Sequence, residues 1–255
     1  MKKLISDIRL HFHYAIQPLA SATNYLNPEP EGRHTALVWN TDDKCMQTKP
    51  FGDQHSIIVM FDPLVCSLTV KSAEDMFQFD LKKKTLSYAY NWLKMVFNEL
   101  GINPNQLVPL DYPTYDFPYH PLALGNSFET ISEDAKKILI DLFDRSFLAL
   151  KKITDNPIGL YPHHFDLATL IHHEDKSIGL GFSPGDQSYD CPYWYVYVYP
   201  YPSILPGLSI GHWHTQGWKG MVMTWEEGED ITIEKIKEFF IVSIKVANNL
   251  LGIEK

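Results

Sequence analysis

The sequence is poor in cysteine, in long apolar runs and in positive charge. Three cysteines occur among 255 residues, Cys45, Cys66 and Cys191, and none forms a CxxC pair. A sparse, odd set is typical of reduced thiols, so we predict a cytoplasmic location rather than a disulfide framework. No run of about 20 apolar residues is present, and no membrane span is therefore expected.

Positively charged residues are in the minority. The chain has 22 Lys and Arg residues and 31 Asp and Glu residues, which gives a net charge of −9. A broad cationic surface for phosphate backbones is not expected, and no nucleic-acid partner is predicted. The first residues, MKKLISDIRLHFHY, begin with two lysines as a signal peptide does. Asp7 and Arg9 interrupt the apolar stretch that export would require. The absence of GxSxG, Walker, GxGxxG and HExxH motifs leaves the reaction class open.

Apolar and aromatic residues are abundant, at 45% and 13%, which is typical of a globular chain. Five prolines between positions 104 and 121 exclude regular helix or ladder from residues 103–128 and indicate an extended connector. We predict an N-terminal α+β half at 1–128, which includes this connector. A linking helix and a C-terminal α+β half would follow at 129–255, and the two halves could form one compact domain.

Short apolar runs separated by turn residues predict most of the strands. They lie at 9–16, 34–40, 56–61, 65–70, 164–171, 177–182, 193–199 and 219–225. Helical spacing of apolar residues through residue 150, after a capping-box pair at Thr130 and Glu133, predicts a helix between the halves. Short strands with few crossover helices predict an α+β fold of mainly antiparallel sheets, with helices packed on the sheet faces.

Three sequence echoes occur in the same order in both halves. They are HYAIQPL (13–19) with HFDLATL (164–170), SIIVMFDP (56–63) with SIGLGFSP (177–184), and LKMVFNELGI (93–102) with IKVANNLLGI (244–253). The last pair predicts two helix ends, each with a glycine in the left-handed conformation. The order of the echoes suggests two degenerate repeats of strands followed by a helix, with chance similarity as the alternative.

Two histidine-rich segments are the candidates for chemistry. In YPHHFDL, strand alternation would place His164 and Asp166 on one face, while a shift of register would place His163 there instead. In GHWHTQGW, alternation places His212 and His214 together. If the segments adjoin, His164, Asp166, His212 and His214 could bind a divalent transition metal such as zinc. A metal-free polar pocket and purely structural histidines are the alternatives.

The run PYWYVYVYPYP at 192–202 gives one strand face a row of tyrosines. Tyr195 and Tyr197 on this face could line a ligand site, with Trp218 as a further wall. Asp186, in the turn FSPGDQSYD, could bind a ligand or cap its own backbone. A sheet face covered by a helix and a dimer surface are alternative interpretations of the row.

Four segments, YPHHFDLA, GFSPGD, the tyrosine-rich strand and GHWHTQGW, together resemble a family of uncharacterised bacterial proteins known only as a domain of unknown function. The resemblance is strongest over 160–225. It implies that the four segments form one unit and implies no activity, cofactor or catalytic residue.

These patterns favour a soluble protein with a small-molecule pocket in its C-terminal half. The pocket could serve metal-assisted hydrolysis, with a metal-activated water as the nucleophile. Without a metal, the histidines could act as acid and base. The alternatives are a non-catalytic binding or regulatory module and a structural homodimer. The substrate and the catalytic residues stay unassigned.

Overall fold

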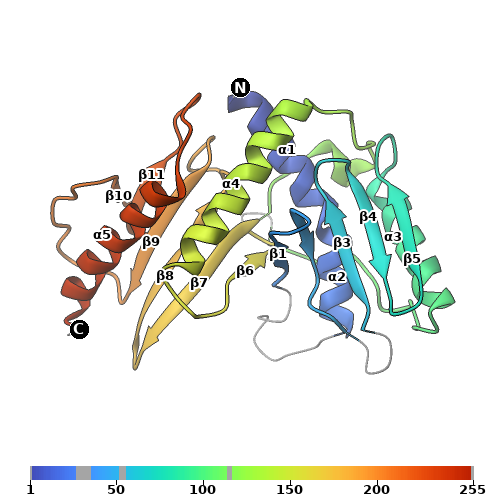
Figure 1. Ribbon diagram of the computed structural model, residues 1–255, viewed down its shortest axis with the longest axis horizontal. Helices are drawn as coiled ribbons and strands as arrows, with labels where there is room; N and C mark the ends of the chain where they lie inside the picture. Colours follow the sequence, from blue (N-terminus) through green and yellow to red (C-terminus); the bar gives the residue numbers. More distant parts are fainter. Residues whose placement is uncertain (1, 27–35, 52–55, 114–116, 254–255) are drawn as a thin grey trace. The chain divides into compact units, whose positions relative to one another are not determined.

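The computed structural model describes residues 2–26, 36–51, 56–113 and 117–253 (Figure 1). Its contacts divide the chain into two compact units. The N-terminal unit comprises Lys3–Ile140 and Leu160–Phe165, and the C-terminal unit comprises Met1–Lys2, Asp141–Gly159 and Asp166–Lys255. The division therefore falls inside a helix, whereas the sequence-based boundary at 128/129 precedes that helix.

The N-terminal unit combines helices with a five-stranded antiparallel meander whose order is β1-β2-β3-β4-β5. Its elements are α1 (Lys2–Ala15), α2 (Gln17–Leu26), β1 (Val38–Asn40), β2 (Cys45–Gln47), β3 (Ile58–Asp62), β4 (Ser67–Lys71), β5 (Met76–Asp80) and α3 (Leu86–Glu99). Alternate residues of the central strands, such as Val59 and Phe61, are fully buried, and Phe61 contacts Phe12 of α1 edge to face at 5.5 Å.

The second sheet has six strands in the order β10-β11-β9-β8-β7-β6, and its described strand pairs are antiparallel. Its elements, with the flanking helices, are α4 (Glu133–Lys151), β6 (Gly159–Tyr161), β7 (Asp166–His173), β8 (Lys176–Ser183), β9 (Tyr193–Tyr199), β10 (His212–His214), β11 (Gly220–Thr224) and α5 (Ile233–Leu251). The two antiparallel sheets with their helices confirm the predicted α+β class.

One face of the six-stranded sheet is buried under helices. Trp194 and Val196 of β9 are fully buried, and the Trp194 indole Nε1 donates to Ser146 Oγ of α4 at 2.8 Å. Phe143, on the same helix, meets Phe182 of β8 edge to face at 5.1 Å. The α5 helix also packs on β8 and β9, and Figure 1 shows it lying along the sheet. The Trp/Val side of β9 is therefore the core side, which leaves the tyrosine side facing away from these helices.

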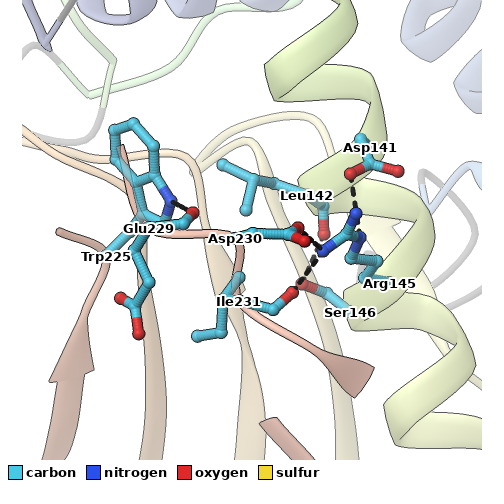
Figure 2. Close-up of polar contacts among 8 residues, drawn as sticks. All are labelled: Asp141, Leu142, Arg145, Ser146, Trp225, Glu229, Asp230 and Ile231. Carbon is cyan, nitrogen blue, oxygen red and sulfur yellow. Dashed lines mark hydrogen bonds and ion pairs between the residues drawn. The ribbon is translucent and has the colours of Figure 1, made fainter. Parts of the chain in front are cut away.

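Arg145 of α4 holds the loop that enters α5 (Figure 2). Its Nη1 donates to the Ile231 carbonyl at 2.6 Å and to Asp230 at 2.5 Å, while its Nε pairs with Asp141 at 2.8 Å. The Asp230 side chain is 84% exposed, so water weakens that ion pair. The bond to the Ile231 carbonyl therefore carries more of the anchoring, because it fixes the backbone one residue before the Thr232 N-cap of α5.

Apart from β10, the two sheets share one connection scheme, a meander of five strands followed by a helix. The echo SIIVMFDP/SIGLGFSP falls on β3 and β8, which are each the third strand of their meander. The echo at the helix ends falls on α3 and α5, where Gly101 and Gly252 have φ of 75° and 62° as predicted. Related strand orders are what a duplication requires.

The predicted strand at 9–16 is wrong, because residues 9–15 lie in α1 and residue 16 is the turn residue before α2. The third echo therefore pairs helix at 13–19 with a turn and strand at 164–170. Alternation of His11 and His13 around Phe12 imitates a strand, but Ile5, Ile8 and Phe12 have helical spacing and are all buried. In this segment the helical spacing of the buried residues indicates the correct secondary structure, and the local alternation does not.

Further predictions from the sequence concern the start of α4, the 103–128 connector, the strand at 34–40 and membrane spans. The α4 helix begins at Glu133 with the Ser132 hydroxyl accepting from Ala135 N–H, so the predicted Thr130 cap is wrong. Described residues of the 103–128 connector form no strand and only a short 3₁₀ turn, Pro121–Leu124. Residues 34–35 of the predicted strand 34–40 lie outside the described residues. Within the described part of the chain, no helix is both long and apolar enough to cross a membrane.

Candidate functional site

Strand register places the predicted tyrosines and histidines on one face of the six-stranded sheet. One row of directly opposed residues runs Ala168, Gly181, Tyr195, Val222 and His212 across five strands. The next row runs Leu170, Gly179, Tyr197, Gly220 and His214. Side chains of directly opposed residues share a face. His212 and His214 therefore share a face with the tyrosine row, opposite to the helix-covered face, and we call this surface the tyrosine–histidine face.

Glycines let the aromatic rings lie flat on this face. The Tyr195 ring occupies the space that a Cβ at Gly181 would need, since such an atom would stand 2.7 Å from the Tyr195 hydroxyl oxygen. The Tyr197 ring covers Gly179 in the same way, and the Trp218 ring covers Gly220. The two tyrosine rings stack at 6.2 Å with an interplanar angle of 20°. The alternation of glycine along β8 is thus complementary to the alternation of tyrosine along β9.

Two carboxylates hold the tyrosines in place. The Tyr195 hydroxyl donates a short hydrogen bond to Asp166 Oδ2 at the start of β7, and the Tyr193 hydroxyl donates to Asp186 Oδ2 at 2.6 Å. Burial and, next, the Asp166 charge raise the pKa of Tyr195 well above its usual value. Burial and then Asp186 raise that of Tyr193. Both phenols therefore stay protonated and act as donors that fix the rings, not as proton acceptors.

Asp186 also orders the turn that carries Tyr189. Its Oδ1 accepts from the backbone N–H groups of Ser188 at 2.7 Å and Tyr189 at 2.9 Å, and its own N–H donates to the Tyr189 carbonyl. This is the backbone-capping role that the sequence allowed for Asp186. It positions Tyr189, a residue for which the sequence analysis proposed no role, between the two histidines.

The Tyr189 hydroxyl bridges His212 and His214. It lies 3.1 Å from His212 Nε2 and 3.1 Å from His214 Nδ1, while His214 Nε2 lies 2.6 Å from the Gln216 carbonyl oxygen. We call these three side chains the His–Tyr–His relay. His212 is exposed, whereas His214 is only 8% exposed and stacks on Trp218 at 4.3 Å. The relay thus runs from solvent into the covered part of the face.

The direction of the relay follows from its inner end. A carbonyl oxygen can only accept, so His214 Nε2 must carry a hydrogen. In neutral His214, Nδ1 is then an acceptor, and the Tyr189 hydroxyl must donate to it. Tyr189 oxygen therefore accepts from His212 Nε2–H, which leaves Nδ1 of neutral His212 as a lone pair. Nothing else among residues with described positions bonds to that nitrogen, so the relay presents an acceptor to solvent.

His163 and His164 lie in the turn between β6 and β7, not on a strand. The prediction that His164 and Asp166 share a strand face is therefore wrong. The turn residue Phe165, with φ of 57°, intervenes between them, and its N–H donates to the Tyr161 carbonyl. The two imidazoles lie 4.1 Å apart, and both belong to the N-terminal unit. Asp166, Asp186, Tyr195, Tyr197, His212, His214 and Trp218 all belong to the C-terminal unit.

The predicted metal set is not supported by the ligand geometry. No group of three or more His, Cys, Asp or Glu side chains in the described ranges could hold a metal ion. The nitrogens of His214 are both engaged by Tyr189 and Gln216, and Asp166 accepts from Tyr195. These residues do not fit zinc in this arrangement, so we derive no chemistry from a metal.

Comparison with protein-family models, with curated proteins and with solved structures found no match.

Proposed function

We propose that the C-terminal unit binds a small molecule at the tyrosine–histidine face, with His212 as the residue that contacts it. The observation that carries this proposal is the direction of the His–Tyr–His relay. It supports His212 Nδ1 as an exposed acceptor whose ring orientation is already fixed by Tyr189. A preoriented acceptor costs less side-chain entropy on binding than a free surface histidine does.

The expected ligand carries a hydrogen-bond donor next to a flat apolar group. The donor would bond His212 Nδ1, and the apolar group would contact the half-buried aromatic surface of Tyr189, Tyr197 or Trp218. Binding without catalysis is the proposed role. The metal-assisted hydrolysis considered from the sequence has no ligand set to support it among the residues that the structure places. The buried Tyr193 and Tyr195 are unsuited to a dimer surface.

Acid–base chemistry is a second candidate, which the relay itself favours. A proton taken up at His212 Nδ1 would let the Nε2 proton pass to the Tyr189 oxygen while the Tyr189 proton passes to His214 Nδ1. The positive charge would then reside on His214, whose Nε2–H stays bonded to the Gln216 carbonyl. A substrate that must lose a proton could use this route.

The binding proposal is tested with phenol as the probe, because it combines a donor with a flat ring. Titration of phenol into ¹⁵N-labelled protein should shift the His212 Nδ1 resonance, whereas anisole, which lacks the donor, should not. His212→Ala should weaken phenol binding at least fivefold, and His172→Ala, a change at an exposed histidine at the end of β7, should not affect it. Equal binding by both variants, or an unmoved His212 resonance, would disprove the proposal.

A further inference from the structure

The outer edge of β5 in the N-terminal unit has unpaired backbone groups. The β5 strand is the last strand of its sheet, and within the ranges that the structure covers no other strand pairs with it on that side. Hydrogen bonds link Ser72 with Asp75 and Leu81 with Cys66 across the β4–β5 register. Because antiparallel bonds alternate along a strand, Phe77 and Phe79 bond β4, and Met76, Gln78 and Asp80 point their N–H and C=O groups outward.

The side chains of this edge are unusually apolar for an exposed strand. Met76 is 72% exposed, and Phe77 and Phe79 are only half-buried. The Phe79 ring stacks on Trp92 of α3 at 5.2 Å, and Met95 of the same helix is 61% exposed. Open edges with such residues invite pairing with another strand, and proteins normally blunt them with charge or cover.

Charge is present here, but it is placed at the two ends with opposite sign. The sequence reads SAEDMFQFDLKKK over 72–84. Glu74 and Asp75 precede the strand, and Lys82 and Lys83 follow it. An antiparallel copy of the same strand would set the acidic end of one chain against the basic end of the other. A parallel partner would set like charges together.

We propose that two copies of this chain pair through β5, antiparallel and edge to edge, to form a continuous ten-stranded sheet. The two-fold axis passes between the two Gln78 residues, whose outward N–H and C=O groups bond each other reciprocally. Met76 then opposes Asp80 of the second copy, and Phe77 opposes Phe79 at the closer, non-hydrogen-bonded positions. The strand is therefore self-complementary in backbone, in aromatic contact and in charge. This inference is independent of the proposed ligand site.

The test uses charge reversal at either end of β5, read by sedimentation velocity over a range of protein concentration. The wild type should sediment as a dimer. The E74K/D75K variant and the K82E/K83E variant should each weaken dimerisation at least tenfold, because every end contact becomes repulsive. An equimolar mixture of these two variants should dimerise again, since each acidic end then meets a basic end.

The matched control is D42K/D43K, which makes the same change of charge in the β1–β2 turn and should leave the dimer intact. A second variant, Gln78→Pro, removes one outward N–H and leaves the β4–β5 ladder in place. It should give a monomer with an unchanged far-ultraviolet spectrum. A monomeric wild type would overturn the inference, and so would a dimer that neither charge variant weakens or that mixing does not restore.

Discussion

Tyr189, a single turn residue, connects the two histidines of the candidate site by hydrogen bonds. His212 and His214 are brought together by alternation on β10, but the direction of their hydrogen bonds comes from Tyr189 and from the Gln216 carbonyl. Asp186 holds Tyr189 through the turn backbone. The roles of three side chains thus depend on one carbonyl that accepts a bond from His214.

We expect Tyr189→Phe to release the outer histidine and not the inner one. In the wild type, ¹⁵N resonances should show His212 protonated at Nε2 and unprotonated at Nδ1. In the variant, His212 should become a mixture of tautomers, because its Nε2 loses its acceptor. His214 should stay protonated at Nε2 through Gln216. A change of tautomer at His214, or none at His212, would contradict the relay direction. Tyr201→Phe, a change at an exposed tyrosine, is the control.

His13 of the N-terminal unit is expected to make stability depend on acid. It is 3% exposed, its Nε2 bonds the Pro162 carbonyl at 2.7 Å, and burial lowers its pKa to about 3. Arg9, His164 and His163 act in the same direction by charge repulsion. Between pH 6.5 and 3 the unfolded chain therefore binds a proton at His13 that the folded chain does not. Over this range His13 lowers the free energy of unfolding by about 1.4 kcal/mol for each pH unit by which the pH falls.

This prediction is checked by urea unfolding at pH 6, 5 and 4. The free energy of unfolding should fall less steeply with decreasing pH in His13→Gln than in the wild type, and the difference between the two slopes should be about the His13 contribution given above. His172→Gln, at an exposed position, should keep the wild-type slope. If the slopes of wild type and His13→Gln agree, His13 is not held neutral in the folded state.

At the scale of elements, β8 is specified by its glycines as much as by its apolar residues. We expect Gly181→Ala to destabilise the protein by about 1–3 kcal/mol, because the new Cβ would meet the Leu167 backbone oxygen at 2.6 Å. Gly207→Ala, which adds a Cβ in open space, should change the unfolding free energy by less than about 0.5 kcal/mol. Thermal unfolding of the two variants makes the comparison, and equal stabilities would show that β8 yields to the added group.

The sequence predicted those elements whose side-chain period is unambiguous. Strand β8 follows from its short apolar run between turn segments, β9 follows from the alternation of its tyrosines, and α4 follows from its apolar stripe. The α1 helix was missed because alternation of His11 and His13 competes with helical spacing over the same residues. Strand β5 was missed because it is only five residues long, MFQFD, and is flanked by charged residues on both sides, and because nothing local marks an edge strand. Tyr189 was missed because its role depends on a contact with residues 23 and 25 positions later.

At the scale of the whole molecule, the two units share one helix. Residues 133–140 of α4 belong to the N-terminal unit and 141–151 to the C-terminal unit. Phe61→Ala would leave a cavity in the N-terminal unit and destabilise that unit by about 3–5 kcal/mol. We expect this variant to raise hydrogen exchange in β8 as well as in β3, because unfolding of the first half of α4 would weaken the second half. Exchange that rises in β3 alone would show that the units unfold independently. Tyr88→Ala, at an exposed position of α3, is the control.

The rings that lie over Gly179 and Gly181 have a consequence for how the sheet keeps out water. A strand with glycine on one side has no side chain there to shield its own peptide groups, and the tyrosines of the next strand take over that task. The cover of β8 is therefore supplied by β9. Truncating one of these tyrosines would therefore expose peptide groups of β8 to water first. The opposite face of β9 would stay buried, because Trp194 and Val196 pack there against the helices.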